Sequence, residues 1–170
     1  MDKKPIFTVD WETWHDAISV YIGIGQIDDM LLEPTLYILD VLKRNNIKAI
    51  FYVLGITKHR NPSIYKAIVE DGHIIKSHGF EHSKGQKDAD RQPYAILGPC
   101  GGFWMRFLPY SVWKWFVLFQ KHCYIHPHDV MTNHPNLINS WFNWKRHINL
   151  KSARVKLERL LKEVKFNEPR

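Results

Sequence analysis

Three short β-rich runs separated by helical stretches constrain the fold of this chain more than any other feature. The runs cover residues 5–9, residues 48–55 and the pair Ile74–Ile75, and amphipathic stretches over 34–45 and 63–70 lie between them. Strands that are joined through helices pair in parallel, with right-handed crossovers. The order β-α-β-α-β therefore predicts an α/β fold built on a parallel sheet.

Length, charge and cysteine content narrow the class of protein. The chain has 170 residues, 45% of them hydrophobic, which predicts one domain over residues 1–170 with a sizeable core. The net charge of +7 permits an anionic partner, but the basic residues are scattered and match no nucleic-acid motif, so we expect no nucleic acid to bind. Cys100 and Cys123 form no C-x-x-C pair, which favours two structural thiols over a zinc ribbon or a disulfide scaffold.

Apolar segments of this chain are too short or too interrupted to cross a membrane. The apolar run after Lys4 is broken by Thr8 and is shorter than the core of a signal peptide. The most apolar segment, residues 98–120, contains Arg106 and Lys114 and falls short of the roughly 20 apolar residues that a span needs. We expect a cytoplasmic protein without a transmembrane segment, in which residues 98–120 can lie against a membrane surface.

Acidic and histidine side chains follow two of the predicted strands. Asp10 and Glu12 come directly after the first strand, and residues i and i+2 of an extended chain project to the same side. His78 and His82 follow the third strand; in one helical turn, positions i and i+4 lie about 5–6 Å apart, close enough to share a divalent ion. Since α/β proteins bind ligands at the carboxyl ends of their strands, the pattern indicates a metal site. The alternatives are a solvated loop for the carboxylates and a chance spacing for the histidines.

The segments that carry these side chains resemble motifs of the polysaccharide deacetylase family, the NodB-homology or carbohydrate esterase 4 group. The resemblance rests on Phe7–Glu12, Ala49–Gly55 and Gly72–Ser83, in the family's order, and Gly101–Tyr110 and Tyr124–Pro127 are similar to the subgroup associated with exopolysaccharide and O-antigen loci. It implies a distorted (β/α) barrel and a hydrolase that removes N-acetyl groups from amino sugars with a divalent metal. The expected metal is zinc, with cobalt or another divalent ion as the alternative.

The same resemblance implies roles for individual residues. It makes Asp10 the general base, His126 the catalytic acid, and Glu12, His78 and His82 the metal ligands. Glu12 replaces the family's usual second aspartate, since Trp11 follows Asp10 here. A set of two histidines and one carboxylate leaves coordination positions open for water and a substrate carbonyl. The same set could hold non-haem iron instead, and His126 could be a hydrogen-bonded residue at the end of a strand.

The resemblance also implies a residue that orients the general base and residues that bind the saccharide. Arg91 is the candidate that orients the base, with a plain linker as the alternative, and the candidate substrate contacts are Tyr94, Gly102, Phe103, Trp104 and Arg106. Only eight residues separate His82 from Arg91, whereas a complete (β/α)8 barrel takes at least about 200 residues, so we expect a shortened barrel. Two hypotheses follow: an active deacetylase of N-acetylated saccharides, or an inactive relative that binds carbohydrate or serves in assembly. Both are compatible with a homo-oligomer.

The second half of the chain gives four structural expectations. Residues 101–104 are predicted to form a tight turn that presents aromatic side chains, and residues 131–149 a polar loop. Residues 111–121 predict a helix that is apolar nearly all round and therefore packs against the sheet, unless missing elements expose one face for dimerisation or membrane contact. Residues 150–164 predict an amphipathic terminal helix.

Overall fold

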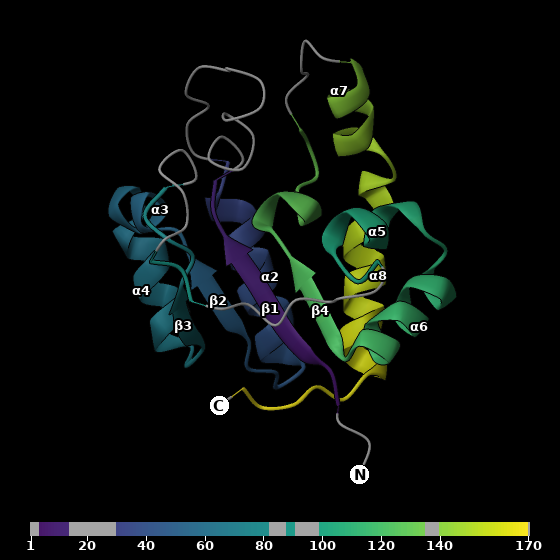
Figure 1. The fold of residues 1–170 in the computed structure, drawn as a ribbon, viewed down its shortest axis with the longest axis horizontal. Helices are drawn as coiled ribbons and strands as arrows, with labels where there is room; N and C mark the ends of the chain where they lie inside the picture. The colour runs from purple at the N-terminus through teal and green to yellow at the C-terminus, as the bar shows by residue number, and fades with distance from the viewer. Residues whose placement is uncertain (1–3, 14–29, 82–87, 91–98, 135–139, 170) are drawn as a thin grey trace.

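A parallel sheet lies at the centre of the computed structural model, which describes residues 4–13, 30–81, 88–90, 99–134 and 140–169 (Figure 1). Within these residues the sheet has the order β3-β2-β1-β4, and all its pairings are parallel. Its strands are β1 (Ile6–Trp11), β2 (Ile50–Val53), β3 (Ile74–Ser77) and β4 (His122–Ile125). The predicted α/β fold with parallel strands is confirmed.

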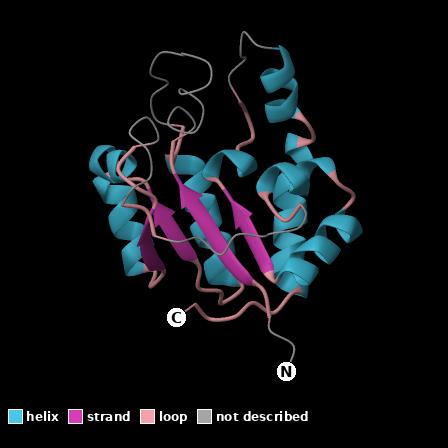
Figure 2. Cartoon of the chain, in the orientation of Figure 1, coloured by secondary structure: helices cyan, strands magenta, loops and turns pink. Residues whose placement is uncertain are grey.

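Helices connect the strands and cover the sheet (Figure 2). They are α2 (Leu32–Arg44), α3 (Gly55–Arg60), α4 (Pro62–Glu70), α5 (Gly102–Phe107), α6 (Tyr110–Gln120), α7 (Ser140–His147) and α8 (Leu150–Glu163), with a 3-10 turn, η2 (Pro127–Val130). The predicted helices correspond to α2, α4, α6 and α8. Among the helices of the described ranges, none is long and apolar enough to cross a membrane.

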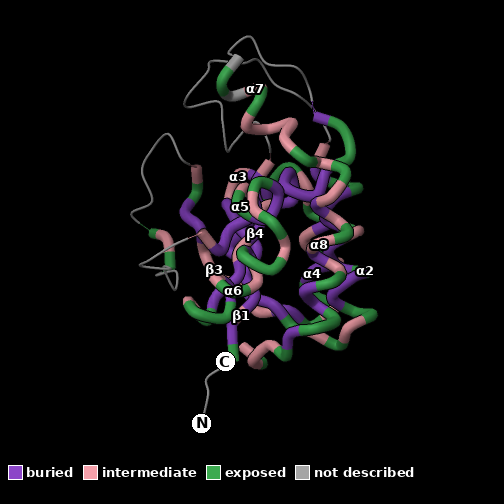
Figure 3. The backbone as a smooth tube through the Cα atoms, turned by 90° about the vertical axis from the view of Figure 1, so that its right-hand side faces the viewer, coloured by how far each residue is buried: buried purple, intermediate pink, exposed green. Residues whose placement is uncertain are grey.

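The core lies between one face of the sheet and the helices α2, α4 and α8. Because side chains alternate along a strand, β1 directs Phe7, Val9 and Trp11 into this core, while Thr8 and Asp10 lie on the other face. The Trp11 indole also donates a hydrogen bond to Thr35 of α2 over 3.1 Å, which satisfies its only polar atom. The strands β1, β2 and β4 are accordingly buried along most of their length, whereas all four residues of β3, at the end of the strand order, are only half-buried (Figure 3).

Two expectations about the second half of the chain are wrong, and the helix over 111–121 follows the alternative stated for it. Residues 101–104 do not form an isolated turn but lead into α5, and the predicted loop over 131–149 contains α7. The helix α6 buries only Trp113 and Val117 fully and leaves its opposite apolar face exposed. A pattern that is apolar all round does not say which face has a partner, so only the tertiary structure shows it.

Both cysteine side chains, Cys100 and Cys123, are free thiols in the core. Burial raises the pKa of Cys100 to about 11 and that of Cys123 well above its usual value. The expectation of structural thiols is therefore confirmed for both residues.

Candidate active site

Four ionisable side chains meet at the carboxyl ends of three strands of the sheet. Asp10 is the fifth residue of β1 and Glu12 follows that strand, His78 follows β3, and His126 follows β4. The parallel pairing brings these three strand ends to the same edge of the sheet, at the top of Figure 1. Residues that are more than a hundred positions apart in the chain therefore share one site.

The Glu12 carboxylate lies between two imidazoles. Its Oε1 atom is 3.4 Å from Nε2 of His126, and its Oε2 atom is 3.8 Å from Nε2 of His78. Asp10 approaches His126 on the same side, with 3.7 Å between Oδ2 and Nε2. Glu12, Asp10 and His78 are buried, whereas the His126 side chain is 22% exposed and is the most accessible member of the group.

These donors fit a divalent metal. Imidazole nitrogens and carboxylate oxygens are ordinary zinc ligands at about 2.0–2.2 Å, so two ligand atoms of one ion lie no more than about 4 Å apart. The separations between Glu12 and His78 and between Glu12 and His126 satisfy that limit. Both carboxylates are also buried, a position that is costly for a negative charge without a cation nearby.

A second group of possible ligands lies beside the first. Atoms of His126, His128 and Asp129 that can bind a metal lie within 4.8 Å of one another. Asp129, however, already forms an ion pair with Arg106, whose Nη2 atom is 3.2 Å from Oδ1. Because a guanidinium there would repel a cation, Glu12 and His78 form the better metal site.

The backbone after β3 does not form the helical turn that the spacing of His78 and His82 suggested. His78 pairs with Ala89 in an isolated antiparallel bridge, and Gly79 adopts φ +87°, a left-handed conformation that glycine tolerates without strain. The prediction of a helical turn is therefore wrong for residues 78–81. His82 lies outside the described residues, as do Arg91 and Tyr94.

Asp129 holds His126 in position, a contact that the sequence analysis missed. The backbone N–H of His126 donates to Oδ2 of Asp129 over 2.9 Å, and the ring atom Nδ1 lies 3.3 Å from the same oxygen. The Nε2 atom is thereby left to face Asp10 and Glu12. An acidic residue three positions after a His-Pro pair is the local signal for this contact, because it can cap the turn η2.

Arg106 and Gly102, two predicted substrate contacts, pack against Asp129. Arg106 is 1% exposed, and its guanidinium donates to Asp129 and to the backbone carbonyl of Arg146 over 3.2 and 2.5 Å. A Cβ atom at Gly102 would overlap the Asp129 carboxylate, and one at Gly101 would overlap the ring of Tyr124. These glycines permit α5 to approach β4 and η2 closely.

Nearby charges determine the protonation states of His126 and Asp129. Burial by itself would lower the pKa of His126, but Asp129, Glu12 and Asp10 raise it to about 9, so the imidazole is protonated at neutral pH. Burial would likewise raise the pKa of Asp129, but His128, His126 and Arg106 hold it well below its usual value. The pair is an imidazolium bound to a carboxylate.

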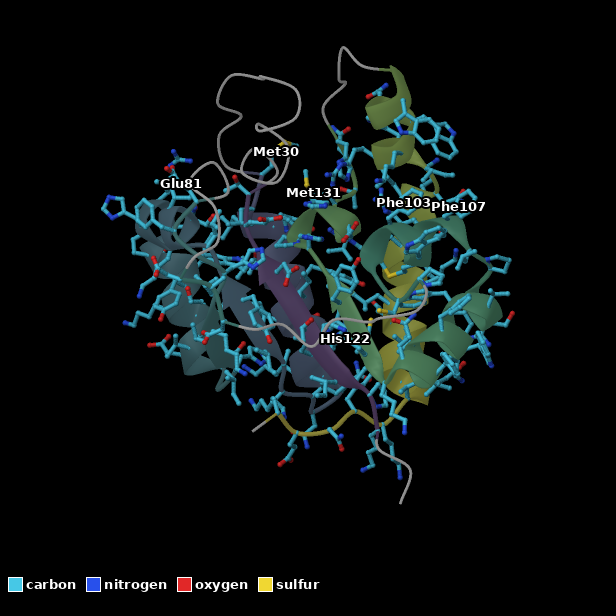
Figure 4. All side chains as sticks on the ribbon, in the orientation of Figure 1. Met30, Glu81, Phe103, Phe107, His122 and Met131 are labelled. Carbon is cyan, nitrogen blue, oxygen red and sulfur yellow. The ribbon has the colours of Figure 1, made fainter. Side chains whose placement is uncertain are left out.

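An exposed aromatic cluster lies on α5 and α7, above the end of β4. The rings of Phe103 and Phe107 stack with centroids 5.7 Å apart, Phe107 contacts Trp144 edge-on at 6.4 Å, and Trp144 stacks on Trp141 at 5.2 Å. Trp104 contacts the ring of Phe103 at 5.2 Å. Figure 4 shows Phe103 and Phe107 on α5. The two tryptophans of α7 were not predicted, since their segment was assigned to a loop.

Comparisons with families of known proteins divide the chain in two. Residues 25–97 match the family model described as polysaccharide deacetylase, and residues 88–170 match a domain of unknown function, DUF3473. The metal-ligand candidate His78 lies in the first match, and His126 with its support lies in the second.

Two proteins of similar sequence are named as deacetylases. A peptidoglycan-N-acetylglucosamine deacetylase, PgdA of Listeria monocytogenes, is 40% identical over 57 residues, which are 34% of this chain and 12% of PgdA. A chitooligosaccharide deacetylase of Sinorhizobium fredii is 29% identical over 108 residues, which are 58% of this chain and 49% of that protein. The chain therefore spans less than half the length of either relative.

The solved peptidoglycan deacetylase PdaC of Bacillus subtilis has a similar fold. It superposes with a TM-score of 0.51 at 13% sequence identity, covering 96% of this chain and 85% of PdaC. At this identity the likeness concerns the fold alone. It confirms the predicted fold class, a shortened and distorted (β/α) barrel of the NodB type.

Proposed function

Because residues 25–97 match the polysaccharide deacetylase family, we propose that this chain is a hydrolase that removes N-acetyl groups from amino sugars of a polysaccharide or its precursor. The observation that carries the proposal is the convergence of Asp10, Glu12, His78 and His126 at one edge of the sheet. The names of the relatives, which act on peptidoglycan and chitooligosaccharides, support an N-acetylated saccharide as the substrate.

Glu12 and His78 would hold a divalent ion, zinc first among the candidates, and the predicted third ligand is His82. When bound, the ion would supply Lewis acidity to the acetamide carbonyl and to the attacking water. Glu12 is suited to this role because its two oxygens face two different imidazoles. Arg91 stays a prediction for the residue that orients the base.

Asp10 and His126 would carry the two proton transfers of amide hydrolysis. Asp10 accepts a proton from the water whose oxygen bonds to the acetyl carbon. His126 donates a proton to the amine nitrogen as the carbon–nitrogen bond breaks. Acetate and a free amino sugar are the products. The raised pKa of His126 supports its role as the acid, because the donor must hold its proton at the working pH.

Asp129 and Arg106 would be positioning residues, because they act through His126. Asp129 fixes the ring and stabilises its protonated form, and Arg106 keeps the Asp129 carboxylate ionised in a buried place. Saccharide contacts are assigned to the half-buried ring of Phe103 and the exposed rings of Trp104, Trp141 and Trp144, on which a sugar ring can stack. Tyr94 stays a prediction for the same surface.

The alternative is a catalytically inactive relative that binds carbohydrate. The exposed aromatic cluster favours it, because stacking on a sugar needs no metal and no acid. The deacetylase requires Asp10 and His78, whereas carbohydrate binding by the aromatic cluster requires neither residue.

Metal content and acetate release, measured in the same samples, test the proposal. The wild type is expected to bind one equivalent of zinc and to release acetate from an N-acetylglucosamine oligomer. Asp10→Asn should keep the metal and lose activity by about a hundredfold or more, as removal of a general base does. His78→Ala should lose both, and His59→Ala, on the exposed surface of α3, is the matched control. A wild type that binds no metal after reconstitution with zinc or cobalt contradicts the proposal; oligomer binding without metal then supports the inactive relative.

A further inference from the structure

The helix α6 has two apolar faces, and only one of them has a partner in the fold. Trp113 and Val117 are fully buried against the core. On the opposite side, at the helical spacing i, i+3, i+6 and i+7, an apolar stripe is exposed to solvent. It consists of Val112, Trp115, Leu118 and Phe119, which are 40, 56, 43 and 59% exposed.

This exposed stripe, which we call the α6 ridge, is a continuous surface. The rings of Trp115 and Phe119 stack with centroids 5.2 Å apart and planes inclined by 10°. The helix α6, which carries the ridge, lies on the side of the molecule that faces the viewer in Figure 3. Single exposed apolar residues are ordinary, but a contiguous apolar patch marks a surface that meets another apolar phase.

A basic groove of about 460 Å³ adjoins the ridge, and Leu118 belongs to both. The groove is lined by Lys4, Pro5, Lys114, Leu118, Lys121, Glu163, Val164 and Lys165. Its one carboxylate, Glu163, lies 2.7 Å from both Lys114 and Arg159 and is therefore neutralised. Within the described part of the chain, the other three lysines have no ion pair, so the groove is positively charged.

The fold holds these lysines together. Asn167 donates from its backbone N–H to the carbonyl of Pro5 and from its side chain to that of Lys4, both over 2.9 Å, which fixes the C-terminal segment beside β1. The Ile6 N–H donates to the carbonyl of Lys121 over 3.0 Å. Lys4, Lys121 and Lys165 are thus brought to the amino ends of β1 and β4, opposite the candidate active site.

We propose that the α6 ridge and the basic groove together dock on the surface of an anionic lipid bilayer. Tryptophan and phenylalanine are favoured at the boundary between head groups and acyl chains, where a helix lying in the plane of the membrane buries its apolar face. Lysines beside such a helix bind lipid phosphates and strengthen binding to an anionic surface. The two features adjoin each other as that chemistry requires. The candidate active site, at the opposite ends of the strands, stays open to a saccharide.

A second copy of this chain fits the same surface less well. A symmetric dimer through the ridge would bring two basic grooves toward each other, since the same patch contacts itself across a two-fold axis. Like charges opposed in this way repel each other. The lipid surface satisfies both the apolar stripe and the lysines, and the inference does not depend on the proposed chemistry.

Co-sedimentation with lipid vesicles tests the proposal. The full chain should bind vesicles of equal parts phosphatidylglycerol and phosphatidylcholine at least about tenfold more tightly than vesicles of phosphatidylcholine alone, with the difference lost at high salt. Trp115→Ala/Phe119→Ala should abolish binding to both kinds of vesicle. Lys4→Gln/Lys121→Gln should abolish only the preference for the anionic ones.

Matched variants elsewhere on the surface are the controls. Leu36→Ala/Val155→Ala removes two exposed apolar side chains from α2 and α8, and Lys43→Gln/Lys66→Gln removes two exposed charges. Both should bind as the wild type does, and circular dichroism should show every variant folded.

Equal binding to the two vesicle types, or vesicle binding by the ridge variant at the wild-type level, would overturn the proposal. The proposal would also be overturned if the wild type did not bind vesicles and light scattering showed it to be a dimer that the Trp115→Ala/Phe119→Ala variant does not form. Acetate release from a soluble oligomer should be the same in all of these variants, which separates this test from that of the proposed function.

Discussion

His126 illustrates how a single residue obtains its chemical character from its neighbours. Its ring is placed by Asp129, which lies three residues further along the chain, and its Nε2 atom faces carboxylates that belong to β1 and its extension. The carboxylates together outweigh the effect of burial on its pKa. At this scale, the proposed acid depends on charges that the sequence places more than a hundred residues away.

Replacing Asp129 by Asn should change the pH dependence of acetate release. The loss of the negative charge lowers the pKa of His126, and an acid catalyst loses activity as the pH rises through its pKa. The alkaline limb of the pH–rate profile should therefore move to lower pH in Asp129→Asn, with kcat reduced about tenfold or more. The variant should also be less stable by about 3 kcal/mol, because the buried Arg106 loses its partner.

The control for this experiment is Asp90→Asn, which removes an exposed carboxylate near the end of β3. Its alkaline limb should stay in place. An unchanged limb in Asp129→Asn as well would show that Asp129 only supports the fold and does not position the acid.

The packing of α5 against η2 and α8 is the decisive contact at the scale of elements. Gly102 permits α5 to touch η2. Lys156 of α8 donates hydrogen bonds to the carbonyls at the end of α5, those of Met105, Arg106 and the residue after the helix, Leu108, over 3.0, 3.3 and 2.7 Å. These carbonyls have no partner within the helix, so a cation from a neighbouring helix satisfies them. This packing of α5 against η2 and α8 places Arg106 against Asp129.

Gly102→Ala should destabilise the fold and impair the site at once. Its new methyl group would overlap Asp129, and relief of the overlap should cost about 1–3 kcal/mol and lower acetate release at least about tenfold, as urea unfolding and the acetate assay can show. Gly72→Ala is the matched control. Its cost comes from a φ of +74° far from the site, so it should lose about 1 kcal/mol and keep its activity. Equal activity losses in the two variants would contradict a specific role of Gly102.

Lys156→Met should destabilise the chain through α5 alone. Methionine keeps the length and apolar stem of the side chain but removes the three donated hydrogen bonds, so the free energy of unfolding should fall by about 2 kcal/mol. Lys162→Met, at an exposed position of the same helix, should change it by less than about 0.5 kcal/mol. Identical urea midpoints for the two variants would refute the capping role.

The pH dependence of stability is a property of the whole molecule. His73, His122 and His134 lie in three different parts of the fold, and burial first of all lowers the pKa of each to about 4. Between pH 6.5 and pH 4 the unfolded chain therefore binds protons that the folded chain does not bind. Protons that bind only to the unfolded chain stabilise the unfolded state. The free energy of unfolding therefore falls as the pH is lowered through this window.

We expect the free energy of unfolding, obtained from urea titrations, to fall steeply between pH 6.5 and pH 5, by up to about 2 kcal/mol per buried histidine. His122→Gln should lessen the slope, because glutamine can keep a hydrogen bond to Thr8, which lies 2.9 Å from the ring, but cannot titrate. The exposed His59→Gln should leave the slope unchanged. A His122→Gln profile parallel to that of the wild type would contradict this account.

Local patterns were sufficient to predict most of the framework. The β-rich runs and their helical spacers predicted the parallel sheet, and α2, α4, α6 and α8 follow from apolar periodicity. The position of Asp10 and Glu12 after a strand likewise predicted a shared site, because the carboxyl ends of parallel strands meet at one edge. The short helices α3, α5 and α7 were not predicted, since six to eight residues carry too little periodicity to be separated from a loop.

The sequence by itself thus determined the succession of the first three strands with α2 and α4, the helices α6 and α8, the resemblance to a family and the edge of the sheet where the polar residues gather, because these depend on local spacing and on motifs. Only the tertiary structure decided that Arg106 and Gly102 pack on Asp129, that residues 79–81 are not helical, and that one face of α6 is exposed. These outcomes depend on contacts between distant segments. The free energy of such contacts is a property of the packed fold, and the residue types at the individual positions do not reveal it.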